Sequence, residues 1–153
     1  MIGFETHDHK HCIAAGVAAA DSHCRRAGLQ LTPARRRVLE ILLEKHRALG
    51  AYEILEMLDK GAKPPTAYRA LDFLVKHGFA HRIERLNAFI ACAHPGEEHS
   101  PAFLICRSCD AVAETPSEST KGRLGDAARG AGFKIERAVV EAVGLCPKCQ
   151  EPT

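Results

Sequence analysis

The sequence predicts an α+β fold, in which an N-terminal winged-helix domain is followed by a small C-terminal α/β domain. Three observations support this prediction. Helical patterns fill the first half of the chain, the hydrophobic period changes from 3.6 to 2 after Gly78, and the second half carries two Cys-x-x-Cys pairs. The 153 residues are 46% hydrophobic and 26% charged, which excludes a disordered, collagen-like or coiled-coil chain.

Capping residues and turns delimit the predicted helices. Thr32 is a good N-cap and Pro33 a good first residue for the second helix. Gly28 and Gly78 favour the ends of the first and the fourth helix. We therefore expect helices over residues 12–27, 33–45, 51–59 and 65–77.

The fourth predicted helix has the pattern of a DNA-recognition helix. Its apolar residues lie on one face, and Arg69, Asp72 and Lys76 lie together on the opposite face. A short helix that follows a Pro turn and presents an arginine fits this role. The alternative, a plain amphipathic helix, is the commoner object.

The β-structure is predicted from alternation and from turn residues. A hairpin is expected around Leu86-Asn87, and three helices followed by a hairpin make a winged helix. The domains are predicted as residues 1–92, a hinge loop at 93–101, and residues 102–153. The remaining expected elements are strands at 80–85, 88–92, 102–105, 111–114 and 133–143 and a helix at 117–130.

The net charge of +2 is unevenly distributed along the chain. Residues 25–85 hold 13 basic and 7 acidic side chains, a net of +6, whereas residues 1–24 and 86–153 each carry a net of −2. This is a modest footprint for a polyanion such as DNA. A solvated helical surface is the alternative explanation.

The two Cys-x-x-Cys pairs predict a structural metal site. In a reducing compartment, such pairs bind zinc more often than they form disulfides, because each turn presents two thiolates to one ion. A thioredoxin-like redox pair is the alternative, but that motif begins a helix, and here Leu104-Ile105 precede the first pair as a strand. The four candidate ligands are Cys106, Cys109, Cys146 and Cys149.

A second group of potential metal ligands surrounds the join between the two halves. A hairpin turn centred between Leu86 and Asn87 would place His81 directly opposite Cys92, within reach of one shared metal ion. His99 in the hinge loop and Glu114 on a later strand complete a mixed N, S and O set that suits zinc, and His94 is a possible substitute for His99. Unrelated packed or solvated residues are the alternative explanation.

Several motifs resemble the ferric uptake regulator superfamily. They are Leu31-Thr32-Pro33-Ala34-Arg35, Ala51-Tyr52-Glu53-Ile54-Leu55, and above all the run from Lys63 to Leu74, together with the four-cysteine arrangement. Pro-Pro-Thr-x-Tyr-Arg-Ala-Leu-Asp-Phe-Leu is typical of the zinc uptake regulator branch. The dense His-rich run of iron and peroxide sensors is missing before the first Cys pair, where Pro95-Gly96-Glu97-Glu98-His99 stands instead.

The resemblance implies a homodimeric, zinc-responsive repressor of zinc uptake genes that binds an inverted-repeat DNA operator. It implies two Zn²⁺ ions per subunit: a structural ion on the four cysteines, and a regulatory ion on His81, Cys92, His99 and Glu114. The residues expected to contact DNA are Tyr52, Thr66, Tyr68 and Arg69.

This function has alternatives. An iron or peroxide sensor and a zinc buffer or metallochaperone are the alternatives. An enzyme is not expected, because the sequence has no nucleophile–base motif and a Cys₄ site has no open coordination position. No small-molecule substrate is expected. No membrane association is expected either, since the longest apolar stretch, 13–20, is far shorter than the roughly 20 residues of a membrane-spanning helix. The acidic residues Glu5 and Asp8 argue against a secretory signal, so a cytoplasmic location is expected.

Overall fold

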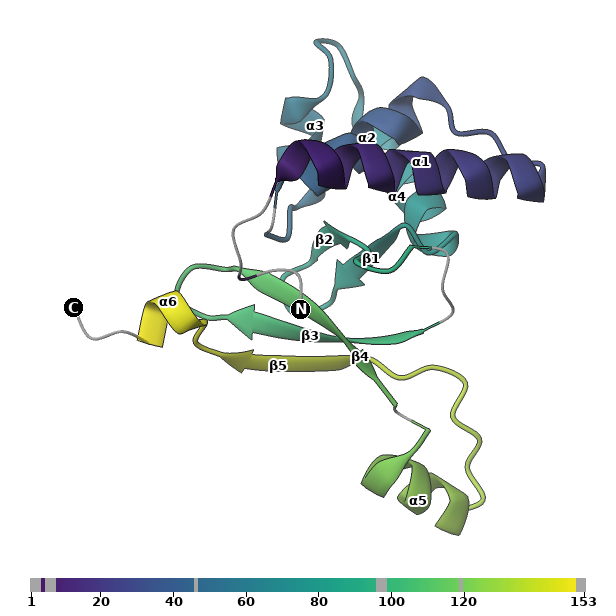
Figure 1. The fold of residues 1–153 in the computed structure, drawn as a ribbon, viewed down its shortest axis with the longest axis vertical. Helices are drawn as coiled ribbons and strands as arrows, with labels where there is room; N and C mark the ends of the chain where they lie inside the picture. Colours follow the sequence, from purple (N-terminus) through teal and green to yellow (C-terminus); the bar gives the residue numbers. More distant parts are fainter. Residues whose placement is uncertain (1–3, 5–7, 46, 96–98, 119, 151–153) are drawn as a thin grey trace.

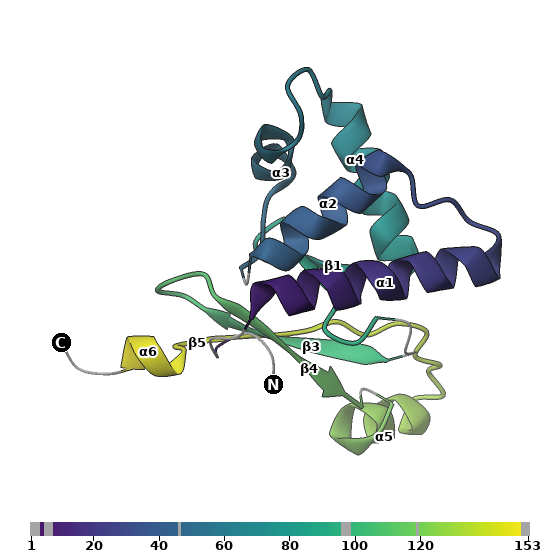
Figure 2. The same cartoon turned by 45° about the horizontal axis from the view of Figure 1, so that its top comes forward.

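The computed structural model describes residues 4, 8–45, 47–95, 99–118 and 120–150. The four N-terminal helices occupy the upper part of the molecule, a two-stranded hairpin lies below them, and a three-stranded sheet with the two C-terminal helices forms the lower part (Figure 1). The turned view keeps this order, with the sheet on the side of the hairpin away from the helices (Figure 2). The fold is therefore α+β, as predicted.

The four N-terminal helices follow the predicted caps closely. They are α1 (His9–Ala27), α2 (Pro33–Glu44), α3 (Ala51–Met57) and α4 (Pro64–Lys76). The first begins three residues earlier than expected, because the side chain of Asp8 accepts a hydrogen bond from the backbone N–H of Lys10 and caps the helix there. At its other end, Gly28 adopts φ 67°, a left-handed conformation that suits glycine.

The helices pack around one apolar core. Leu39, Leu42, Leu71 and Leu74 are almost completely buried in it, and Phe79 closes the end nearest the hairpin. At roughly 1.5–3 kcal/mol for each fully buried side chain of this size, the core strongly favours the helical assembly over separate helices. The sides of α2 and α4 that are buried in this core are the apolar faces that the sequence pattern predicts.

The hairpin differs from the prediction in its register. It consists of β1 (Ala80–Ile83) and β2 (Ala88–Ala91), and His81 pairs with Ile90 rather than with Cys92. The prediction was wrong because the turn takes four residues, 84–87, and is closed by a bond from the N–H of Asn87 to the carbonyl of Glu84. The shift in pairing is two residues, so His81 and Cys92 remain on one face, as diagonal neighbours.

The C-terminal sheet has the strand order β4-β3-β5, with β3 antiparallel to β4 and parallel to β5. The predicted long strand over 133–143 is wrong in its first part, because residues 133–139 form no strand and only the end of the segment pairs with β3. The elements are β3 (Ser100–Cys106), β4 (Val112–Ser117), α5 (Gly122–Gly130), β5 (Val140–Gly144) and α6 (Pro147–Gln150).

A second apolar cluster joins the hairpin to this sheet. Ile83 and Ile90 from the hairpin pack with Phe103, Ile105 and Val112 from β3 and β4. The hairpin therefore contacts the helical core on one side and the C-terminal sheet on the other. None of the helices in the described part of the chain has the length and apolar character needed to cross a membrane.

Candidate metal centres and DNA-binding face

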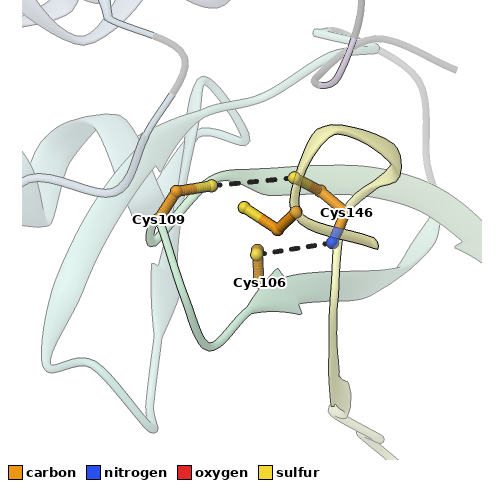
Figure 3. Close-up of side chains that lie close together, drawn as sticks. Cys106, Cys109 and Cys146 are labelled. Carbon is orange, nitrogen blue, oxygen red and sulfur yellow. Dashed lines mark hydrogen bonds between the residues drawn. The ribbon is translucent and has the colours of Figure 1, made fainter. Parts of the chain in front are cut away.

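Four cysteines meet at one end of the C-terminal sheet. Cys106 ends β3, Cys109 follows it in a turn, Cys146 lies between β5 and α6, and Cys149 lies in α6. We call them the four-cysteine cluster, and their sulfur atoms all lie within 4.8 Å of one another. Figure 3 shows Cys109 and Cys146 pointing toward each other, with their sulfur atoms 3.7 Å apart. Asp110, at φ 58°, follows Cys109, and its backbone N–H donates to the carbonyl of Cys106 at 3.0 Å, which closes the turn.

The thiols of this cluster differ in pKa because they differ in their hydrogen bonds. The backbone N–H of Cys146 donates to the sulfur of Cys106 at 3.3 Å and lowers the pKa of Cys106 to about 6. For Cys109, a backbone N–H from Ala111 acts in the lowering direction, but the neighbouring thiols and burial raise its pKa to about 12. A charged thiolate therefore disfavours ionisation of the neighbouring thiols. A soft cation is needed to hold all four sulfurs deprotonated.

Four further side chains meet between the hairpin and the sheet. His81 comes from β1, Cys92 follows β2, His99 precedes β3, and Glu114 lies on β4. We call them the mixed-ligand cluster, and their ligand atoms also lie within 4.8 Å of one another. Glu114 Oε1 is 2.8 Å from His99 Nε2 and 3.2 Å from His81 Nε2, and Cys92 Sγ is 3.5 Å from His99 Nε2.

The mixed-ligand cluster is largely buried, and its charges favour a cation. Glu114 is only 3% exposed. Burial alone would raise its pKa, but the adjacent side chains of His81 and His99, together with the backbone N–H of Ala93 that donates to the carboxylate, lower that pKa to about 2. Among the described residues, the Nε2 of His81 is a buried nitrogen without a well-formed hydrogen bond, although it faces Glu114. An unsatisfied buried nitrogen beside a carboxylate and a thiol fits a metal ligand.

Both clusters contain the residues that the sequence predicted for them. His94, a neighbour of Cys92, is exposed and lies outside the mixed-ligand cluster, although its ring centre is 5.9 Å from that of His99. Among the N-terminal histidines, His7 lies outside the described residues, whereas His11 lies in the first turns of α1.

The predicted DNA-contact residues lie on α3 and α4. Thr66, Tyr68 and Arg69 are exposed on α4, and Tyr52 is 71% exposed on α3. The opposite face of α4 is buried through Ala67, Ala70, Leu71 and Leu74. A helix that is anchored on one side and polar on the other can enter a groove without losing its own packing.

One contact between the two halves was missed by the sequence reasoning. The carboxylate of Glu141 on β5 accepts hydrogen bonds from the backbone N–H groups of Glu84 and Arg85, at 2.7 and 3.1 Å. Its partners are backbone atoms, which leave no motif in a sequence. The available signal is weak: Glu141 is an acidic residue between the apolar pairs Val139-Val140 and Ala142-Val143.

Comparison with known proteins gives consistent matches. The profile of the ferric uptake regulator family matches residues 26–143. The zinc uptake regulation protein of Escherichia coli (strain K12) is 38% identical over 140 residues, which cover 88% of this chain and 81% of that protein. The structure of a zinc uptake regulator complexed with zinc and DNA superposes with a TM-score of 0.84 at 36% identity, covering 90% of this chain and 94% of that one.

A third relative, XcZur, has been solved in two forms. Its holo structure matches with a TM-score of 0.80 at 40% identity, covering 88% of this chain and 96% of that one. Its apo structure matches with a TM-score of only 0.53 at 37% identity, covering 92% and 99%. The arrangement of helices, hairpin and sheet described above is therefore much closer to the holo form of that protein than to its apo form.

Proposed function

This chain belongs to the ferric uptake regulator family, and from this premise we propose that it is a zinc-responsive repressor of zinc uptake genes. The observation that carries the proposal is the mixed-ligand cluster, whose buried ligands come from the hairpin and from the C-terminal sheet. The relatives named as zinc uptake regulators support zinc as the effector.

We assign two zinc ions to each subunit. The four-cysteine cluster has the donor set of a closed structural site, which is tetrahedral and keeps no open position. The mixed-ligand cluster provides two imidazoles, a thiol and a carboxylate, a set that suits zinc and disfavours magnesium or calcium. In both clusters, a bound zinc ion would supply positive charge and a fixed ligand geometry.

Filling the mixed-ligand cluster links the DNA-binding half to the sheet. His81 lies on the hairpin that packs below the recognition helix, and Glu114 lies on β4. These residues can converge on one ion only when hairpin and sheet are close together. Zinc therefore favours the closed arrangement over open ones by its differential affinity, which is how an effector shifts a conformational equilibrium.

The exposed side of α4 is proposed as the DNA-reading surface. Arg69 is the candidate for bidentate hydrogen bonding to a guanine, while Thr66, Tyr68 and Tyr52 contact neighbouring bases or backbone. A dimer then places two such helices in successive major grooves of an inverted repeat. The net of +6 over residues 25–85 supports this orientation toward DNA. We accordingly place the protein in the cytoplasm.

The C-terminal half supports a homodimer. Leu124 and Phe133 are 56% and 67% exposed, and three valines of the β5 region are also exposed, namely Val139, Val140 and Val143. One edge of β5 pairs with β3, and β5 is the terminal strand of its sheet. Such a combination of apolar side chains with an outer strand is suited to burial against a second copy.

The alternatives have less support. An iron or peroxide sensor would leave the match to zinc uptake regulators and the thiol of Cys92 in the mixed-ligand cluster unexplained. A zinc buffer would give no role to the exposed face of α4. Membership of this family points to regulation of transcription rather than to catalysis.

A DNA-binding titration tests the proposal. The protein is added to a labelled zinc-transporter promoter from its own genome, and anisotropy is followed at fixed salt while free zinc is buffered from low to high. Tight binding that appears only as zinc rises is expected, with ferrous iron as the parallel effector. Binding with iron alone would assign the protein to the iron sensors, and retention of two zinc ions without DNA binding would favour a buffer.

A further inference from the structure

One transverse row of the C-terminal sheet makes both polar and apolar contacts to the hairpin region. In the strand register, Glu114 on β4 and Glu141 on β5 both pair with Phe103 on the middle strand. Residues paired across neighbouring strands point to the same face of a sheet. The two carboxylates therefore flank Phe103 on one face, at the two outer strands.

Each member of this row contacts a different part of the hairpin region. Glu114 faces His81 and accepts the backbone N–H of Ala93, at the mixed-ligand end. Phe103 packs in the apolar cluster with Ile83 and Ile90. Glu141 holds the turn of the hairpin at the other end. The row thus contacts the hairpin at three points, and only one of them involves the mixed-ligand cluster.

The contact of Glu141 is specific to the turn at residues 84–87. Both of its oxygens are used, Oε1 by the N–H of Glu84 at 2.7 Å and Oε2 by the N–H of Arg85 at 3.1 Å. These are charge-assisted bonds, which are stronger than bonds between neutral groups. Arg137, in the segment that leads into β5, adds a longer ion pair of 3.9 Å to the side chain of Glu84.

The turn at residues 84–87 directs the N–H groups of Glu84 and Arg85 toward Glu141. Asn87 adopts a left-handed conformation at φ 46°, and its side chain accepts a hydrogen bond from Arg82 at 2.9 Å. The turn is thereby held in one shape independently of the sheet. The carboxylate of Glu141 meets a preformed pair of donors, which favours a single docking geometry.

We propose that Glu141 is a metal-independent latch between the hairpin and the C-terminal sheet, and that it sets the zinc affinity of the mixed-ligand cluster without being a ligand. This inference rests on the proposed function only in taking that cluster as the zinc-responsive site. Glu141 is a positioning residue, because it acts through the position of the hairpin.

The link between latch and affinity follows from population arithmetic. The four ligands converge only when the hairpin lies against the sheet, so the apparent dissociation constant is the intrinsic one divided by the fraction of closed molecules. Glu141 stabilises the closed arrangement whether or not zinc is bound. Removing it lowers the closed fraction of zinc-free molecules and weakens zinc binding by the same factor.

The test compares three single variants of the full chain, each with the four-cysteine cluster loaded with zinc. Glu141→Ala removes both acceptors. Glu141→Gln keeps the side-chain length and one oxygen acceptor. Glu136→Ala is the matched control, because it removes an exposed carboxylate from the segment that leads to β5. The two readouts are chelator competition for the more weakly held zinc ion and hydrogen exchange at the amides of Glu84 and Arg85.

Zinc binding in Glu141→Ala should weaken roughly fivefold or more, the lower end of ordinary coupling between sites. The amides of residues 84 and 85 should exchange at least about tenfold faster, since their acceptors are gone. Glu141→Gln should lie between wild type and Glu141→Ala, and Glu136→Ala should match wild type in both readouts.

Two results would overturn the latch. Unchanged exchange at residues 84 and 85 in Glu141→Ala would mean that the contact does not persist in solution. Faster exchange with unchanged zinc affinity would mean that the contact forms but does not govern the cluster. Neither readout involves DNA, so failure of zinc-dependent operator binding would refute the proposed function and leave the latch to be judged on its own data.

Discussion

His81 Nε2 and Glu114 Oε1 lie 3.2 Å apart, although the first belongs to the hairpin and the second to the C-terminal sheet. The pair thus spans the boundary between the DNA-binding half and the rest of the molecule. An ion that needs both atoms therefore binds only when the two halves lie close together at that boundary. This is why the mixed-ligand cluster, rather than the four-cysteine cluster, is suited to regulation.

Removing one thiol separates the roles of the two clusters. Cys92→Ser should leave one zinc ion per subunit and abolish zinc-dependent operator binding, since a hydroxyl is a poor zinc ligand beside two imidazoles and a carboxylate. Zinc content by mass spectrometry under native conditions and anisotropy on the operator measure the two effects. Cys12→Ser is the matched control, because Cys12 lies on α1 outside both clusters. An unfolded Cys92→Ser protein would show that the two sites have been confused.

Arg69 is expected to supply sequence discrimination. Arg69→Ala should reduce the preference for the operator over unrelated DNA by roughly 1–3 kcal/mol, the value of one bidentate base contact. Lys76→Ala, at an exposed position farther along α4, should instead weaken binding to all sequences alike and lower the salt dependence. Operator and non-operator affinities at several salt concentrations distinguish the two. An Arg69→Ala protein with unchanged discrimination would remove α4 from the reading surface.

Zinc binding by the four-cysteine cluster should release protons. The pKa values of Cys109 and Cys149 are raised, so both are thiols near neutral pH in the metal-free protein and must deprotonate on binding. Cys106, with its pKa of about 6, is already largely a thiolate there. At least two protons per ion imply that affinity rises about a hundredfold per pH unit between pH 7 and 8. Calorimetry in buffers of different ionisation enthalpy counts these protons, and an affinity that does not change with pH would contradict the assignment.

The apolar surface around β5 should determine the oligomeric state. Phe133→Glu places a charge in the exposed apolar group and should convert the dimer to a monomer while both zinc ions are retained. Lys134→Gln, at the exposed neighbouring position, changes the net charge by the same amount and controls for it. Sedimentation velocity measures the mass of each variant. A Phe133→Glu protein that stays dimeric would place the interface elsewhere.

The sequence predicted most elements because their signals are local. Caps such as Thr32-Pro33 and glycines such as Gly28 mark helix ends by their own conformational preferences. The four-cysteine cluster was predictable from the spacing of its two Cys-x-x-Cys pairs, whereas the mixed-ligand cluster was predicted mainly from the resemblance to the ferric uptake regulator superfamily. What the sequence predicted about metal and DNA contacts at individual residues stays a prediction.

The parts that could not be predicted depend on contacts between distant segments. The register of the hairpin depended on the length of its turn, and a four-residue turn moved the partner of His81 from Cys92 to Ile90. Residues 133–136 alternate as a strand would, yet residues 133–139 form no strand, and Phe133 and Val139 are exposed. Glu141 was missed because its donors lie 56 and 57 residues away and are backbone groups.

The four-cysteine cluster fixes the register between β3 and β5. Cys106 pairs with Gly144 at the ends of β3 and β5, and the N–H of Cys146 donates to the sulfur of Cys106. Counting back from that fixed end places Glu141, and neither of its neighbours, beside Phe103. A slip of one residue would turn the carboxylate to the opposite face and bring an apolar side chain under the hairpin turn. A metal ion held by the four cysteines would therefore fix the pairing of β3 with β5, which places Glu141 under the hairpin turn. Loss of that ion should disable the response to zinc even in molecules that remain folded.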